Sequence, residues 1–495
     1  MNIDILNCNN INKNEKIKLA EKLGISEDKI KNTDNLCNLI KRYYNDKFPC
    51  NNNIQNDTDI QIKPHQISVA NQLTRTRGVI VFHSVGVGKT LTAIATSQCL
   101  LLSKTIKKVI VITPTSLQEN FKQQMKKYNE DIDFSLYFFY TIQGISNAIK
   151  NKTVENCKKS LVIIDEAHNL RTLDGSRYQS IYDYCLKGEK ILLLTATPLI
   201  NYKHDIINLV SLARGEDPMA IDDFDKIEDK PKELKEYLKD VFNMYIRTSD
   251  KYFPEKKTYE VYLEMDKKYY EMYAHVEKGE VNKIPDFKNN NNISAFYNGV
   301  RRASNIIDDE SPKVDWIIEK ILENKKAKFV IFSHYINMGI KPIMLELDKK
   351  KINYMSITGE MNIKNRKEAV ELYNSGEIKI LFISKAGSEG LDLKNTTYII
   401  ILESSWNENE IEQIIGRGVR FKSHIGLKKS KQKVSVYQLY CVKPNEYENL
   451  DMITKNYLLD YKNEILSVDL YLRNYAKIKQ IKIEDFYKSI RKILN

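Results

Sequence analysis

Short apolar runs recur along the chain, and longer amphipathic stretches separate them. The first four runs are Val79–Phe82, Val109–Ile112, Leu161–Ile164 and Ile191–Leu194. Uninterrupted apolar runs of this length that alternate with helix-like segments are typical of strands buried in a parallel sheet. Polar turns follow the runs, at the position where open α/β sheets bind their ligands. The pattern therefore predicts an α/β domain over residues 61–213.

A second series of apolar runs predicts a second α/β domain over residues 313–444. Its members are Phe329–Phe332, Ile378–Ile383, Tyr398–Leu402 and Val434–Val442. Residues 214–312, between the two series, are charged and helix-prone, so we expect a helical insertion there. Residues 1–60 are Asn-rich with two short helix-like patterns, which predicts a small helical appendage. Residues 445–495 are helix-like and basic, which predicts a basic helical tail.

Composition limits the class of protein. The chain has 495 residues, of which 42% are hydrophobic and 29% charged, so it is long enough for several domains and too apolar to be disordered. Lys and Arg number 77 against 65 Asp and Glu, and the net charge of +12 suits a polyanionic partner. No apolar run is long enough to span a bilayer, and Met1–Lys16 lacks the apolar core of a signal peptide. We therefore expect neither a membrane protein nor a secreted one.

The cysteines are odd in number, scattered, and never arranged as C-x-x-C. Such spacing favours neither a disulfide framework nor a zinc site, and it predicts a protein of a reducing compartment. The seven positions are Cys8, Cys37, Cys50, Cys99, Cys157, Cys185 and Cys441.

The first apolar run leads directly into the sequence HSVGVGKT and then into a helix-like segment. Gly86 and Gly88 allow backbone N–H groups to close around phosphates, and the following helix N-terminus favours anions. Lys89 can neutralise the β- and γ-phosphate oxygens, and the Thr90 hydroxyl can ligate Mg²⁺. His83 stands where the usual phosphate-loop pattern has its first glycine. The segment is nevertheless predicted to bind a nucleoside triphosphate.

Two carboxylates, Asp165 and Glu166, directly follow the third apolar run. One carboxylate can hold Mg²⁺ while its neighbour polarises the attacking water, which is the pair that nucleotide hydrolysis needs. The fourth run ends in Thr195-Ala196-Thr197, whose hydroxyls can hydrogen-bond the acidic pair. In the second domain, Arg417 and Arg420 are three residues apart, so both can lie on one helical face and stabilise charge on a γ-phosphoryl group across a cleft.

These motifs, in this order, resemble a superfamily 2 helicase. Thr113-Pro114 and Asp165–His168 belong to the pattern of its first lobe. The sequences TATPLIN, SEGLDL and GRGVRFKSH, together with Trp406-Asn407, are similar to one subgroup, the Snf2-like nucleoside triphosphatases of large cytoplasmic DNA viruses. Poxvirus nucleoside triphosphatase I and the small subunit of the early transcription factor typify this subgroup. The resemblance covers about Lys63 to Val442.

The resemblance implies two tandem RecA-like domains, with ATP and Mg²⁺ between them and nucleic acid across their top. It implies that Glu166 is the catalytic base and that Gln413 contacts the γ-phosphate or its water. The arginine fingers implied are Arg417 and Arg420. The nucleotide and metal contacts implied are Gln66 at the adenine, Gly86, Gly88, Lys89 and Thr90 at the phosphates, and Thr90 and Asp165 at Mg²⁺. The nucleic-acid contacts implied are Thr113, Thr358 and Ser384.

The leading hypothesis is an ATP-dependent nucleic acid translocase or helicase that acts in viral transcription, on DNA rather than RNA. Two alternatives remain open: an ATP-dependent RNA helicase, and a transcription factor ATPase subunit that does not unwind nucleic acid. A viral RNA polymerase or a transcription factor subunit is the expected protein partner. The virion or the host cytoplasm is the expected location.

Overall fold

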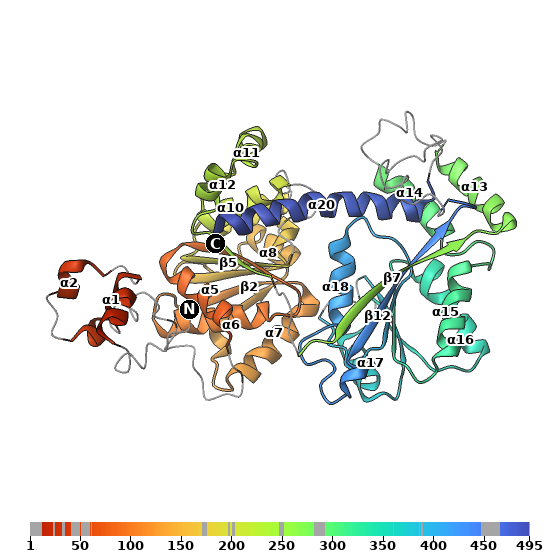
Figure 1. The fold of residues 1–495 in the computed structure, drawn as a ribbon, viewed down its shortest axis with the longest axis horizontal. Coiled ribbons are helices and arrows are strands. Elements are labelled where there is room, and N and C mark those ends of the chain that lie inside the picture. The colour runs from red at the N-terminus through yellow and green to blue at the C-terminus, as the bar shows by residue number, and fades with distance from the viewer. Residues whose placement is uncertain are drawn as a thin grey trace.

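The computed structural model places two α/β lobes side by side (Figure 1). It describes residues 12–22, 25–31, 35–40, 50, 60, 62–170, 176–196, 199, 203–246, 252–281, 293–359, 361–385, 387, 390–446 and 466–494. The Asn-rich stretch Asn289–Asn292, where the sequence predicts a mobile loop within the insertion, lies outside these residues. Each lobe contains a six-stranded sheet in which every pair of neighbouring strands is parallel. The predicted class, two tandem parallel-sheet domains, is confirmed.

The first sheet has the strand order β3-β2-β4-β5-β1-β6. Its strands are β1 (Gly78–His83), β2 (Lys108–Ile112), β3 (Tyr137–Tyr140), β4 (Ser160–Asp165), β5 (Lys190–Thr195) and β6 (Phe242–Tyr245). All four predicted runs are strands and occupy four adjacent positions. Helices cover both faces, so alternate residues of one strand enter different cores: Val79 and Val81 on one side, Ile80 and Phe82 on the other. Burial on both faces is why these strands lack polar positions.

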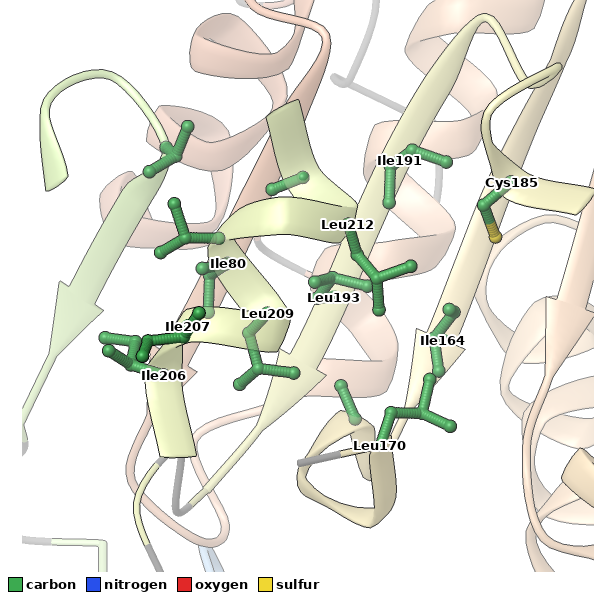
Figure 2. Close-up of a cluster of buried hydrophobic side chains, with 14 of the residues drawn as sticks. Ile80, Ile164, Leu170, Cys185, Ile191, Leu193, Ile206, Ile207, Leu209 and Leu212 are labelled. Atoms are coloured by element: carbon green, nitrogen blue, oxygen red, sulfur yellow. The ribbon is translucent and has the colours of Figure 1, made fainter. Parts of the chain in front are cut away.

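The helices of the first lobe follow this division of the sheet. One face is covered by α5 (Pro64–Arg75), α6 (Lys89–Leu102) and α7 (Thr115–Tyr128). The other is covered by α8 (Ile142–Lys150), α9 (Ser176–Cys185) and α10 (Ile206–Arg214). Figure 2 shows the second core, where Leu209 and Leu212 of α10 lie near Ile80 and Leu193 of the sheet.

The second sheet has the strand order β7-β12-β11-β8-β10-β9. Its strands are β7 (Glu255–Glu264), β8 (Phe329–Ser333), β9 (Met355–Ile357), β10 (Ile380–Ser384), β11 (Tyr398–Ile401) and β12 (Lys433–Val442). Helices α17 (Ile363–Ser375) and α18 (Glu408–Gly418) pack on one face, and α15 (Pro312–Glu323) and α16 (Lys341–Lys349) on the other.

The expectation of a helical insertion over 214–312 misses two strands in that segment. The segment does contain α11 (Ile221–Ile227), α12 (Pro231–Leu238), α13 (Lys267–Val281) and α14 (Ile293–Ala303). It also contributes β6, which pairs with β1, and β7, which pairs with β12 along ten residues. Both are edge strands with exposed or half-exposed positions. A search for uninterrupted apolar runs overlooks such strands, because only one side of an edge strand needs to be apolar.

The basic tail is a structural element that spans the two lobes. Helix α20 (Val468–Leu494) begins against the second lobe and ends against the first, across the top of Figure 1. Arg473 Nη2 lies 2.8 Å from Glu260 Oε2 of β7, and Lys477 also pairs with Glu260. At the other end, the Leu199 N–H donates to the Tyr487 hydroxyl at 3.3 Å. Some of the tail's positive charge therefore anchors the helix.

The N-terminal part contains α1 (Lys13–Lys22) and α2 (Glu27–Lys31), as a helical appendage requires. The expectation that the cysteines form no disulfide is wrong. Cys50 and Cys99 are bonded, with their Cα atoms 5.5 Å apart, and Cys37 is also disulfide-bonded. Scattered spacing could not reveal this, because Cys50 and Cys99 are 49 residues apart and meet only when the appendage packs on α6. Within the described ranges, no helix combines the length and the apolar character needed to cross a membrane.

Candidate functional site

The phosphate loop lies between β1 and α6, as the sequence predicts. Gly86 has φ +80° and Gly88 has φ +89°, in the left-handed region that favours glycine. A Cβ atom added to Gly88 would lie 2.7 Å from Gln66 Nε2. The loop therefore favours glycine at this position because of its conformation, and an added Cβ would also displace the Gln66 amide. Its backbone leads into α6, which begins at Lys89.

Gln66 lies against the phosphate loop and is 2% exposed. Its Nε2 donates to the Gly88 carbonyl oxygen at 3.2 Å, and its Oε1 accepts a hydrogen bond from the Lys63 N–H at 2.8 Å. The amide thus ties the start of α5 to the loop. An adenine contact from Gln66 stays a prediction, while its contact with the loop is observed.

His83 explains the departure from the usual phosphate-loop pattern. Its Nε2 lies 3.1 Å from Asn243 Oδ1 of β6, and burial lowers its pKa to about 3. The neutral ring therefore joins two neighbouring strands. Next to it, Lys89 Nζ donates to the His83 carbonyl oxygen at 3.1 Å. Burial lowers the pKa of Lys89, and the Glu166 and Asp165 carboxylates oppose that shift.

The acidic pair lies at the carboxyl end of β4. Asp165 is 6% exposed, and its Oδ1 accepts the Glu166 N–H at 3.0 Å. Burial, together with the neighbouring Glu166 charge, raises the pKa of Asp165. His168 Nδ1 lies 3.3 Å from Glu166 Oε2 and 3.3 Å from Thr195 Oγ1. The threonine at the end of β5 therefore reaches the acidic pair through His168, and Thr197 lies outside the described residues.

The second lobe closes over this loop with α18. Gly416 approaches Val85 of the phosphate loop so closely that an added Cβ would lie 2.4 Å from Val85 Cγ1. A cavity of about 280 Å³ lies at this junction. Predicted site residues from both lobes line it: Gly86, Gly88, Lys89, Thr90, Asp165, Glu166, Gln413, Arg417 and Arg420. Residues more than 200 positions apart in the sequence thus meet in one cavity.

The two arginines bring positive charge into the cavity from the second lobe, Arg417 from α18 and Arg420 from just beyond its end, so the expectation that both lie on one helical face is wrong. Arg417 and Arg420 both lie near enough to Lys89 to lower its pKa. Arg420 Nη1 donates to the Leu391 carbonyl oxygen at 2.8 Å, and its Nε is 3.9 Å from Asp392 Oδ1. In this structure the Arg420 guanidinium is therefore bonded within its own lobe.

The residues predicted to contact nucleic acid fall into two groups. Thr113 is fully buried at the end of β2, and its N–H donates to the Tyr140 carbonyl oxygen, so it presents no surface to a strand here. Thr358 directly follows β9, and Ser384 is the last residue of the adjacent strand β10. Gly387 lies close to the ends of both strands: its N–H donates to Ser384 Oγ at 3.3 Å, and an added Cβ would lie 2.0 Å from the carbonyl oxygen of Ile357, the last residue of β9.

Three further residues lie at these sites and were not predicted. Arg366 Nη2 donates to the Gly387 carbonyl oxygen at 2.7 Å. Phe421 lines the cavity, and Lys63 Nζ of the first lobe lies 4.4 Å from its ring centre. Lys385 follows Ser384 directly, and its side chain is 71% exposed. Phe421 lies within the motif GRGVRFKSH and Lys385 directly follows a predicted site residue, whereas no sequence signal marks Arg366.

Family models match three stretches of the chain. The model for the res subunit of type III restriction enzymes matches residues 59–200. The model for SNF2-related domains matches residues 138–311, and the model for the conserved C-terminal domain of helicases matches residues 312–422.

Individual proteins are similar over most of the chain. A putative ATP-dependent RNA helicase of Acanthamoeba polyphaga mimivirus is 33% identical over 416 residues, which cover 79% of this chain and 91% of that protein. Nucleoside triphosphatase I of Heliothis armigera entomopoxvirus is 24% identical, over 89% of this chain and 80% of its own length. A solved SWI2/SNF2 ATPase core of Sulfolobus solfataricus in complex with double-stranded DNA aligns with 88% of this chain and 98% of its own, at 19% identity and a TM-score of 0.37.

Proposed function

Because this chain belongs to the Snf2-like viral helicases of superfamily 2, we propose that the cavity between its lobes is the site of ATP hydrolysis. The chain is an ATP-dependent nucleic acid helicase or translocase, and we propose that the nucleic acid on which it acts is DNA. The observation that carries the proposal is the convergence of Lys89, Asp165 and Glu166 from one lobe with two arginines from the other, Arg417 on α18 and Arg420 just beyond its end. We propose domain boundaries of 61–246 and 252–444, so that the first domain includes the edge strand β6 and the second includes the edge strand β7.

The residues present fit a nucleoside triphosphate with Mg²⁺. Glycines with positive φ form a cradle for phosphates, and the partly buried Lys89 side chain offers a counter-charge. The raised pKa of Asp165 reflects a buried acidic pair that a divalent cation would stabilise. Thr90 and Asp165 would hold the Mg²⁺, which would neutralise charge on the β- and γ-phosphates.

The chain's own residues would divide the work of hydrolysis. Glu166 would orient the attacking water and accept its proton, and His168 lies beside the Glu166 carboxylate, with its Nδ1 3.3 Å from Oε2. Gln413 would contact the γ-phosphate or the water. Arg417 and Arg420 would stabilise the charge that develops on the transferred phosphoryl group. Since these last residues belong to the other lobe, hydrolysis would depend on how closely the lobes approach, which is the basis for movement along a strand.

Stimulation of ATPase activity by different nucleic acids tests the choice of polymer. Steady-state ATPase rates are measured without nucleic acid and with saturating duplex DNA, single-stranded DNA and RNA. The proposal predicts the largest stimulation with DNA. RNA is the second candidate, favoured by the name of the mimivirus relative, and greater stimulation by RNA would replace DNA in the proposal. Equal rates in all four conditions would contradict a nucleic-acid-dependent ATPase.

The expected protein partner is a viral RNA polymerase or a transcription factor subunit, in the virion or the cytoplasm of an infected cell. Support comes from the sequence resemblance to viral nucleoside triphosphatases, one of which is 24% identical. Co-purification of the tagged chain with polymerase subunits from infected cells tests this. Recovery of the chain without them would remove the transcription partner and leave the ATPase proposal intact.

A further inference from the structure

Three aromatic side chains of the second lobe, Tyr252, Phe253 and Phe421, form an aromatic cluster at the cavity between the lobes. The Phe421 ring lines the cavity. The ring centres of Tyr252 and Phe253 lie 5.4 Å and 5.9 Å from the Phe421 ring centre, and the rings are inclined to it by 66° and 60°. Phe253 also lies against the phosphate loop, because a Cβ atom added to Gly86 would be 3.3 Å from its ring. The cluster therefore holds Phe421 beside the segment that is predicted to bind phosphates.

The lining of the cavity suits a molecule that carries both charge and an aromatic ring. Charged side chains from both lobes contribute to the lining, Lys89 among them. Among the described residues that line the cavity, Phe421 is the only aromatic one. A nucleoside triphosphate has the same two parts, because its phosphates are anionic and its base is a flat π-system. With the phosphates at Lys89, Phe421 is the residue that offers the base a ring on which to stack.

A side chain of the first lobe now lies over the Phe421 ring. Lys63 Nζ is 4.4 Å from the ring centre, within the distance of a cation–π contact. Lys63 directly precedes α5, so the ring lies near the start of that helix. An ammonium on a long, flexible stem can move aside, and stacking of a nucleobase on an aromatic ring is stronger than the contact of a partly exposed ammonium with the same ring. A base can therefore replace Lys63 on the Phe421 ring.

The Gln66 amide, to which the resemblance assigns an adenine contact, is engaged within the fold. Its Oε1 accepts the Lys63 N–H at 2.8 Å, and its Nε2 donates to the Gly88 carbonyl oxygen at 3.2 Å. The residue is 2% exposed, so little of the amide is open to the cavity. A hydrogen bond from this amide to the edge of a base would compete with the bonds that hold the phosphate loop. The Gln66 amide is therefore better placed to shape the loop than to read a base.

We propose that Phe421 binds the nucleobase of the substrate, and that it does so by stacking, without hydrogen bonds that read the edge of the base. Adenine and guanine offer the same stacking surface and differ only at their edges, so the site should accept both. The smaller pyrimidines should bind more weakly. This inference rests on the proposed function, because it places the phosphates of the substrate at Lys89 in the same cavity.

The choice of base is tested on the wild-type full chain. Steady-state kcat and KM are measured for ATP, GTP, CTP and UTP with the nucleic acid that stimulates hydrolysis most. The values of kcat/KM for ATP and GTP should agree within about tenfold, since stacking tolerates every base. A larger difference between ATP and GTP would overturn the proposal, because only contacts with the edge of the base distinguish these two purines.

Substitutions of Phe421 test the stacking contact itself. Phe421→Ala should raise the KM for ATP about 5- to 150-fold, which corresponds to about 1–3 kcal/mol, and should change kcat by less than about threefold. Phe421→Leu keeps the apolar volume without a flat π-face, so it should also raise KM, and it carries the test if the alanine variant fails to fold. Phe421→Tyr keeps the ring and should resemble the wild type. Inorganic tripolyphosphate has no base, so its inhibition constant should be the same for the wild type and Phe421→Ala.

Tyr252→Ala is the matched control. Tyr252 packs against the same Phe421 ring and is 44% exposed, but it does not line the cavity. The KM of Tyr252→Ala for ATP should stay within about threefold of the wild-type value. An equal rise in KM in Tyr252→Ala and Phe421→Ala would overturn the proposal, because loosening of the aromatic cluster would then be sufficient. Melting temperatures of all variants verify the fold.

An unchanged KM for ATP in Phe421→Ala and Phe421→Leu would overturn the proposal. An equal loss of tripolyphosphate binding in Phe421→Ala would also overturn it, because the substitution would then have altered the phosphate site and not the contact with the base. A wild type that hydrolyses none of the four nucleoside triphosphates would overturn the proposed function itself, and the two failures are thereby distinguished.

Discussion

Replacing Gly416 with alanine should slow ATP hydrolysis without destabilising the protein. The added Cβ would lie 2.4 Å from Val85 Cγ1, whereas ordinary contacts are 3.4–4 Å, so α18 and the phosphate loop must separate by about 1 Å. Overpacking of this kind costs about 1–3 kcal/mol. Because the clash lies between lobes, the cost falls on their closure, and kcat should drop about 5- to 150-fold.

Stability should change in the opposite direction from activity. Alanine is favoured over glycine inside a helix by about 1 kcal/mol, so the melting temperature of Gly416→Ala should be equal to or above that of the wild type. A general loss of structure would lower both quantities together. The two measurements therefore distinguish a defect in lobe closure from a defect in folding.

Val85→Ala provides the compensating change. It removes the Cγ1 atom that the new methyl group meets, while the Val85 Cβ lies 3.4 Å away, at an ordinary contact distance. The assay is steady-state ATPase at saturating ATP and nucleic acid for both single variants and the double variant. The double variant should recover much of the lost rate. A wild-type kcat in Gly416→Ala, or no recovery in the double variant, would refute the reasoning.

Three further predictions follow from the structure. Glu166→Gln should bind ATP and Mg²⁺ but hydrolyse ATP at least about 100-fold more slowly, because the catalytic base is lost; loss of nucleotide binding in a calorimetric titration would contradict its role. Burial acts to raise the pKa of Glu260, but hydrogen bonds from α20 lower it to about 2. The ionised Glu260 carboxylate therefore stabilises the folded protein by at most about 2 kcal/mol after allowance for exposure. This stabilisation is present above about pH 4.5 and is lost as the pH falls toward 2. Glu260→Gln should therefore be less stable than the wild type in chemical denaturation at pH 7, by a margin that shrinks below about pH 4.5, and a constant margin would refute this. Removal of positive charge from the exposed loop before β12 should weaken DNA binding, and the slope of log K against log salt concentration should become less steep by up to about 3. An unchanged slope would show that this loop does not contact the DNA phosphates. The residues replaced by glutamine there are Lys428, Lys429 and Lys431.

Central strands and local motifs could be predicted from the sequence, because both depend on residues that are neighbours in the chain. Strands such as β1 and β4 are buried on both faces, which produces uninterrupted apolar runs. The edge strands β6 and β7 were not predicted, since their partly exposed positions leave a weaker pattern. The phosphate loop was predicted because its glycines and Lys89 lie close together in the chain.

Contacts between distant segments could not be predicted in the same way. The approach of Gly416 to Val85 and the pairing of Lys385 with Glu410 depend on how two sheets and their helices pack. The bridging position of α20 was also missed, since a basic amphipathic helix has the same pattern whether it binds nucleic acid or another part of its own chain. His83 was recognised as a departure from the motif, but its contact with β6 appears only in the folded structure.

The central claim, that residues of both lobes form one hydrolytic site, is tested most directly by the ATPase rate of Arg420→Ala with saturating nucleic acid. Arg420 belongs to the second lobe and lines the cavity that contains Lys89 of the first. Arginine fingers contribute about 10³- to 10⁵-fold to rate, so Arg420→Ala should lose nearly all nucleic-acid-stimulated hydrolysis, and Arg420→Lys should recover little of it because an ammonium lacks the planar fork. Full stimulation in Arg420→Ala would contradict the claim, because hydrolysis would then not require this arginine of the second lobe.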